Sequence, residues 1–107
     1  MAQGMSGMGD LVRQAQKMQQ RMAEVQRGLK ERVVEGTAGG NMVKVLVNGQ
    51  QEVVAVKIDP ACVDPKDVTM LEDLILAAAR AGLKKAKDLA QDEMGKVTGG
   101  LPIPGMF

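Results

Sequence analysis

In this 107-residue chain, the residues whose type and spacing suggest a chemical role are the positively charged ones. Arg13, Lys17 and Arg21 follow one another at intervals of four residues, and no acidic residue occurs between Leu11 and Ala23. This spacing is typical of one face of a helix. Glutamines surround the three cations, and such a row can contact nucleic-acid phosphates without requiring a base sequence. The plainer interpretation is a solvated outer face, and the spacing alone leaves both open.

A second group of cations, Arg80, Lys84 and Lys87, occurs with Lys85 in a later helical stretch. Lys84 and Asp88 are four residues apart, and such a pair on a helix attracts. We therefore expect this second group to be partly neutralised within the chain. The formal net charge of +1 neither supports nor excludes a polyanionic partner, so the distribution of the charges must decide.

Residues suited to catalysis are scarce. The chain has no histidine, the commonest general base and metal ligand. Cys62 has no base near it in the sequence and fits a small buried apolar residue. Asp59, Asp64 and Asp67 could hold a hard cation, but the neighbouring prolines explain them as turn and cap residues. Residues 36–40 lack the Lys-Ser/Thr of a phosphate loop. We therefore expect no enzyme, no cofactor, no metal site and no small-molecule substrate.

Sequence motifs that read nucleotide bases are also absent. The sequence contains no cysteine/histidine zinc finger, no aromatic platform for stacking bases and no short helix-turn-helix. A nucleic-acid partner would therefore be bound through its phosphates and its shape, from the two basic helical faces.

A β-hairpin over residues 41–58 is the element around which the helices must be placed. Its two valine-rich runs meet at Asn48-Gly49, which predicts a two-residue type I′ turn. Val43, Val45 and Val47 share one face of the first strand, but both faces are fairly apolar, so both need cover. A short strand over residues 31–37 and a turn at Ala38-Gly39-Gly40 are expected before it. Because two strands alone are barely stable in water, the hairpin needs a third strand, the helices or a second copy of itself.

Long helices are expected on both sides of these strands. The first begins with Asp10 as its N-cap and carries a heptad-like apolar stripe at Leu11, Ala15, Met18, Met22, Val25 and Leu29. A helix of this length is roughly 30 Å long, more than a small globule covers, so part of it should project.

The second helix is predicted to start at a capping box formed by Thr69 and Glu72. Its small residues from Ala77 to Gly82 indicate close packing on a neighbouring element, and Gly99-Gly100 should end it. The fold class predicted is α+β, with a single α-β-β-β-α domain over residues 10–98. Residues 1–9 are expected to be a flexible N-terminus, and residues 99–107 a flexible Gly/Pro-rich tail or a segment whose Leu, Ile and Phe dock on a neighbouring surface.

Composition also bears on assembly and compartment. The chain has one phenylalanine, no tyrosine and no tryptophan, so a monomeric core would be marginal and a dimer is expected. The sequence starts with neither a signal peptide nor a membrane-spanning run, and its single cysteine fits a reducing compartment. We expect a cytoplasmic protein without a membrane partner.

The order of these elements resembles the YbaB/EbfC family of bacterial nucleoid-associated proteins. The segments that carry the resemblance are Leu11 to Gln19, Val43-Lys44-Val45, Asn48-Gly49, Ile58-Asp59-Pro60, Met70 to Leu74, Gly100-Leu101-Pro102 and Pro104-Gly105. The resemblance covers nearly the whole chain. It implies a homodimer whose sheets join centrally and whose helices project like the arms of tweezers. It also implies binding of double-stranded DNA in the bacterial nucleoid, with roles in nucleoid organisation and gene regulation.

The resemblance implies that both long helices take part in DNA binding, but it identifies no DNA-contacting positions. The choice of DNA-binding residues therefore depends on charge alone and comprises Arg13, Lys17, Arg21, Arg80, Lys84 and Lys87. An alternative hypothesis is a non-catalytic scaffold or adaptor that binds proteins through the adaptable side chains of Met5, Met8, Met18 and Met22. Under that alternative, Met18 and Met22 have a competing structural explanation, which is that they fill the helix stripe.

Overall fold

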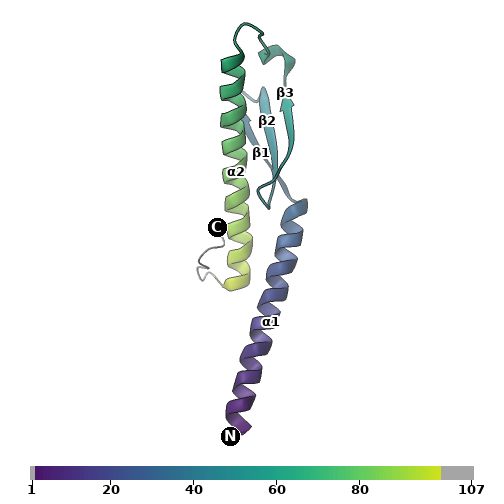
Figure 1. Ribbon diagram of the computed structural model, residues 1–107, viewed down its shortest axis with the longest axis vertical. Coiled ribbons are helices and arrows are strands. Elements are labelled where there is room, and N and C mark those ends of the chain that lie inside the picture. The colour runs from purple at the N-terminus through teal and green to yellow at the C-terminus, as the bar shows by residue number, and fades with distance from the viewer. Residues whose placement is uncertain (1, 100–107) are drawn as a thin grey trace.

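The computed structural model describes residues 2–99 and has the α+β element order that the sequence predicts (Figure 1). The elements are α1 (Ala2–Glu31), β1 (Val33–Ala38), β2 (Val43–Asn48), β3 (Val53–Ile58), the 3₁₀ turn η1 (Pro60–Cys62) and α2 (Val68–Thr98). The fold measures 78 × 21 × 16 Å, since α1 extends away from the sheet. Most of the segment 99–107, predicted to be a flexible tail, lies outside the described residues.

The three strands form one antiparallel sheet in the order β1-β2-β3. The helix α2 packs across β1 and β2 and covers one face of the sheet. Val43, Val45 and Val47 point to that face and are fully buried, together with Ala78 and Ala86 of α2. The sequence places these three valines on one face of β2, and the packing of α2 shows that this face is the core.

The turn between β2 and β3 differs from the predicted two-residue type I′ turn. Gln51 N–H donates to the Asn48 carbonyl oxygen at 2.9 Å, and Gln51, not Gly49, has a positive φ of 63°. The loop is thus one residue longer, with its left-handed residue in third place. Gly49 is needed for a different reason: a Cβ there would lie 2.7 Å from the carbonyl oxygen of Leu29.

Both helix starts differ from the prediction. The first helix begins at Ala2, not at Asp10, and it does so despite Gly4, Gly7 and Gly9, with no proline to interrupt it. The second helix is capped by Asp67, whose Oδ1 accepts the Met70 N–H at 3.1 Å, so the predicted capping box of Thr69 is wrong. An aspartate two residues earlier caps a different amide of the first turn and leaves Thr69 inside the helix.

Only the last third of α1 packs against the rest of the fold. Leu29 is buried, Met22 and Val25 are half-buried, and residues 7–21 are exposed on every side. The prediction that part of the first helix projects is confirmed (Figure 1). The small residues of α2 also pack as predicted, since a Cβ on Gly82 would lie 2.9 Å from Val47 Cγ2.

Candidate nucleic-acid interface

The predicted cations of α1 all lie on its projecting part and are exposed. Arg13 forms an exposed ion pair with Asp10, one turn earlier in the helix. Within residues 2–99, neither Lys17 nor Arg21 makes a side-chain hydrogen bond or an ion pair. Asp10, which lies just before the acid-free stretch, therefore neutralises Arg13. Lys17 and Arg21 stay available to an external anion.

The predicted cations of α2, Arg80, Lys84 and Lys87, are also exposed. The expected pair of Lys84 with Asp88 is wrong, because no ion pair within 4.0 Å joins them. Exposed side chains gain little from such pairs, so solvation competes well. Lys85 is used structurally instead: its Nζ donates to the Glu35 carbonyl oxygen at 2.9 Å and ties α2 to the edge strand.

The two cationic groups do not meet in one chain. Arg32 at the end of α1 contacts Glu93 of α2, and the helices run antiparallel from that point (Figure 1). At about 1.5 Å per residue, Arg13 lies roughly 28 Å from this junction along one helix and Arg80 roughly 20 Å along the other. A single chain thus presents two separate rows of cations, each of which would contact different phosphates.

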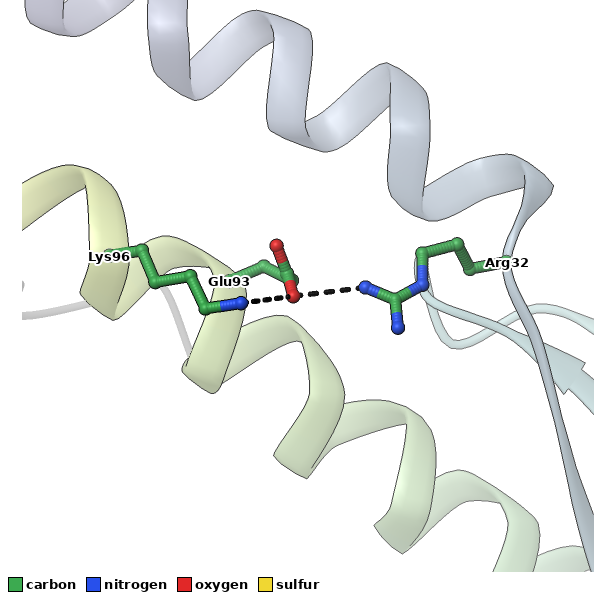
Figure 2. A network of polar contacts seen from close by, with 3 residues as sticks. All are labelled: Arg32, Glu93 and Lys96. Carbon is green, nitrogen blue, oxygen red and sulfur yellow. Dashed lines mark hydrogen bonds and ion pairs between the residues drawn. The ribbon is translucent and has the colours of Figure 1, made fainter.

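Figure 2 shows the polar contacts of Glu93, which join Arg32, the residue after α1, to α2. Glu93 Oε1 accepts from Arg32 Nη1 at 2.9 Å and from Lys96 Nζ at 3.0 Å. The hydrogen bond from Lys96, followed by that from Arg32, lowers the pKa of the Glu93 carboxyl below its ordinary value. No pattern in the sequence predicts this contact, because Arg32 and Glu93 are 61 residues apart and neither position is marked by a motif.

A second set of contacts fixes the base of α1 on the hairpin loop. The Gly49 N–H donates to the carbonyl oxygens of Leu29, at 2.8 Å, and Arg32, at 2.9 Å. Gln50 Nε2 donates to the Gln26 carbonyl oxygen at 2.8 Å. The direction in which Lys17 and Arg21 project is therefore set by the sheet and by α2 together.

The sheet has a free edge at β3. Val53, Val56 and Ile58 pair with the buried valines of β2 and share their face, yet they are 50%, 48% and 36% exposed. The reason is that α2 covers β1 and β2 and does not extend over β3. An apolar edge strand with unpaired backbone groups is a template for pairing with another chain.

The remaining chemical groups have structural roles. Asp59, Asp64 and Asp67 accept the backbone N–H groups of Ala61, Lys66 and Met70, which confirms them as turn and cap residues. Cys62 is 5% exposed and belongs to the core, as predicted. Residues 2–99 hold no cluster of three metal-ligating side chains, and no helix among them is long and apolar enough to cross a bilayer.

Comparison with known proteins agrees with this geometry. Residues 4–101 match the model of the YbaB/EbfC DNA-binding family. A "Nucleoid-associated protein" of Pelotomaculum thermopropionicum is 52% identical over 100 residues, covering 94% of this chain and 95% of the relative. Another relative of that name from Clostridium kluyveri is 49% identical, covering 97% and 91%. The fold resembles the crystal structure of an uncharacterised Helicobacter pylori protein, with a TM-score of 0.73, 22% identity and coverage of 88% and 96%. The chain belongs to the YbaB/EbfC DNA-binding family.

Proposed function

We propose that this protein is a homodimer that binds double-stranded DNA mainly through phosphates, using the cations of α1 and α2. In that role it organises the bacterial nucleoid and regulates genes from the cytoplasm, without catalysis, cofactor or membrane partner. The observation that supports this most is the projecting part of α1, where Lys17 and Arg21 are exposed and lack a carboxylate partner. The family membership and the names of the relatives support the same partner.

The separation of the two cationic rows fits the regularly spaced phosphates of a nucleic-acid backbone better than a small anion. Two points roughly 28 and 20 Å from one junction can contact phosphates more than one helical turn of duplex apart. No aromatic side chain is available for stacking on single-stranded bases among residues 2–99, since the only aromatic residue is Phe107. The partner proposed is therefore a duplex.

The free edge of β3 supports the proposed dimer. Its half-exposed valines form an apolar surface beside α2 that a second copy of the same strand would cover. Joining two sheets at this edge places two projecting α1 helices on one assembly, as in the tweezers arrangement. A dimer has twice as many cations as one chain, so it can make twice as many phosphate contacts.

A salt titration of duplex binding tests this proposal. If three cations of each chain contact phosphates, about six counterions are released per dimer, and log K falls with log salt at a slope near −5. The measurement is fluorescence anisotropy of a labelled duplex from low to physiological salt. Affinity that is absent at low salt, or that does not depend on salt, contradicts the proposal.

A scaffold that binds proteins is the second candidate, because the projecting helix also exposes apolar side chains. Met8 is 69% exposed and Met18 41% exposed, whereas Met22 is half-buried and fills the helix stripe. Pull-down of the protein after nuclease treatment separates the two functions. Protein partners that survive nuclease favour the scaffold, and loss of all partners favours DNA binding.

A further inference from the structure

The projecting part of α1 is bare on all sides, because residues 7–21 are all exposed (Figure 1). At about 1.5 Å per residue this segment is roughly 22 Å long, and a helix with its side chains is roughly 10–12 Å wide. The major groove of a duplex is about 12 Å wide and admits such a helix, whereas the minor groove is only about 6 Å wide. The polar groups of α1 then decide which of its faces points to the floor of the groove.

Two glutamines of α1 each precede a cation. Gln16 is followed by Lys17, and Gln20 is followed by Arg21. Since consecutive residues of a helix are turned by about 100°, the two amides form one row and the two cations form a second row beside it. All four side chains are exposed. Both rows can therefore contact one partner on that side of the helix.

The amide groups of both glutamines are available to that partner. Neither Gln16 nor Gln20 makes a side-chain hydrogen bond within residues 2–99. Leu11 and Met18 are turned by about 140–180° from both glutamines, so the apolar stripe faces away from the amide row. The acid-free face ends at Glu24, one turn beyond Gln20.

We infer, on the basis of the proposed function, that α1 lies in the major groove with Gln16 and Gln20 toward the base edges, where their amides read adenine. A glutamine amide both donates and accepts, so it can bond N6 and N7 of one adenine together. Lys17 and Arg21, turned to the side, hold the phosphates along the groove wall. The cations supply affinity for any duplex, and the two glutamines select the sequence.

The spacing of the two glutamines predicts the spacing of the bases that they read. Four residues rise about 6 Å along a helix, and successive bases of one strand are about 3.4 Å apart along the duplex. Gln16 and Gln20 should therefore contact base pairs about two steps apart.

Duplexes with altered major-groove atoms test this inference. The full-length protein first selects a preferred duplex from a randomised pool. Replacing the adenines of that duplex by 7-deazaadenine removes the N7 acceptor from the major groove and leaves the base pairing and the minor-groove atoms unchanged. The parent protein should bind the selected duplex at least about fivefold more tightly than its 7-deaza form, which is the lower end of the discrimination expected from one bidentate contact.

Glutamine variants assign the discrimination to this face. The double variant Gln16→Ala with Gln20→Ala should bind both duplexes nearly equally, with the salt slope of the parent, because its cations remain. Gln14→Ala is the matched control, since Gln14 is equally exposed on α1 but is turned by about 120–160° from both glutamines. The control should keep the full preference.

The outcomes separate this inference from the proposed function. Salt-dependent binding without a preferred sequence, or with equal affinity for the two duplexes, overturns the adenine readout and leaves phosphate binding by the cations intact. Loss of the preference in Gln14→Ala as well as in the double variant also overturns the readout by this face. Failure of the parent protein to bind any duplex at low salt overturns both.

Discussion

A Cβ atom on Gly36 would lie 2.2 Å from the backbone nitrogen of Gly82. The same atom would lie 2.1 Å from the carbonyl oxygen of Ala78, so α2 crosses β1 with backbone against backbone. No side chain lies between the two elements at this crossing. The position of α2 on the sheet, and through Glu93 the position of α1, depends on this glycine pair.

Gly36→Ala should destabilise the fold by about 3 kcal/mol or more, at the upper end of overpacking costs, because both opposing atoms belong to the backbone. Gly28→Ala is the matched control: it lies in α1 and a Cβ there meets nothing within 4 Å. That substitution should stabilise the fold by about 0.5–1 kcal/mol. Urea unfolding at one fixed protein concentration measures both. Equal effects would show that α2 can shift on the sheet.

Glu93→Gln should remove a pH-dependent part of the stability. Because the folded pKa of Glu93 is lowered, its contribution is present above the pKa of the unfolded chain and is lost as the pH falls through the lowered folded value. The parent protein should therefore have the higher thermal midpoint above about pH 5, and the difference should shrink toward zero in more acid solution. Differential scanning calorimetry from pH 7 downward measures it.

Asp92→Asn is the control for that experiment. Asp92 precedes Glu93 on α2, is exposed and makes no ion pair within residues 2–99. Its substitution should shift the thermal midpoint little, and by the same amount at each pH. A pH dependence equal to that of Glu93→Gln would mean that general charge, not the contact with Arg32 and Lys96, sets the effect.

Replacing Arg13, Lys17 and Arg21 together by alanine should weaken duplex binding and make the salt slope shallower than about −5, because fewer counterions are released. The thermal midpoint should hardly change, because exposed charges contribute little to folding. Within this set Lys17→Ala should weaken binding more than Arg13→Ala, since Asp10 already pairs with Arg13. Anisotropy titrations measure the order, with Lys66→Ala on the loop before α2 as the control cation. A triple variant that binds as tightly as the parent contradicts this interface.

Val56→Asp should convert the proposed dimer to monomers in analytical ultracentrifugation. It places a carboxylate in the free apolar edge of the sheet, where a second copy would have to desolvate it. Leu76→Asp is the matched control, because Leu76 on α2 has the same 48% exposure as Val56. The control should remain dimeric. Dissociation by Leu76→Asp alone would move the interface from the sheet to α2.

Asn48→Ala should destabilise the hairpin by about 1–3 kcal/mol, because two backbone N–H groups lose their acceptor. Asn48 is only 3% exposed, and its Oδ1 accepts from Gln50 N–H at 2.9 Å and Glu52 N–H at 3.1 Å. Gln51→Gly should act in the opposite direction, by up to about 1 kcal/mol, because Gln51 holds a left-handed φ that glycine adopts readily. Urea unfolding compares them, and a neutral Asn48→Ala would show that water replaces the amide.

Local sequence pattern predicted correctly those structural features that depend only on the periodicity of side chains within one element. Alternation predicted that Val43, Val45 and Val47 share one face of β2, and helix spacing predicted the stripe of α1. The turn at Asn48-Gly49 was wrong, because Gly49 is needed for contact with Leu29 and the loop geometry follows from that contact. The N-cap at Asp10 was wrong, because the helix starts eight residues earlier and leaves Asp10 in its interior.

The amino-acid sequence by itself determined the α+β order, the alternation of the strand valines and the charge of the two helices, because these depend on period and residue type within short windows. Only the tertiary structure decided which cations are available to an anion. Arg32 and Lys85 are engaged across long sequence separations, whereas Lys17 and Arg21 project into solvent. The physical reason is that availability depends on which groups the packing of α1, α2 and the sheet brings within bonding distance, and no local pattern encodes that distance.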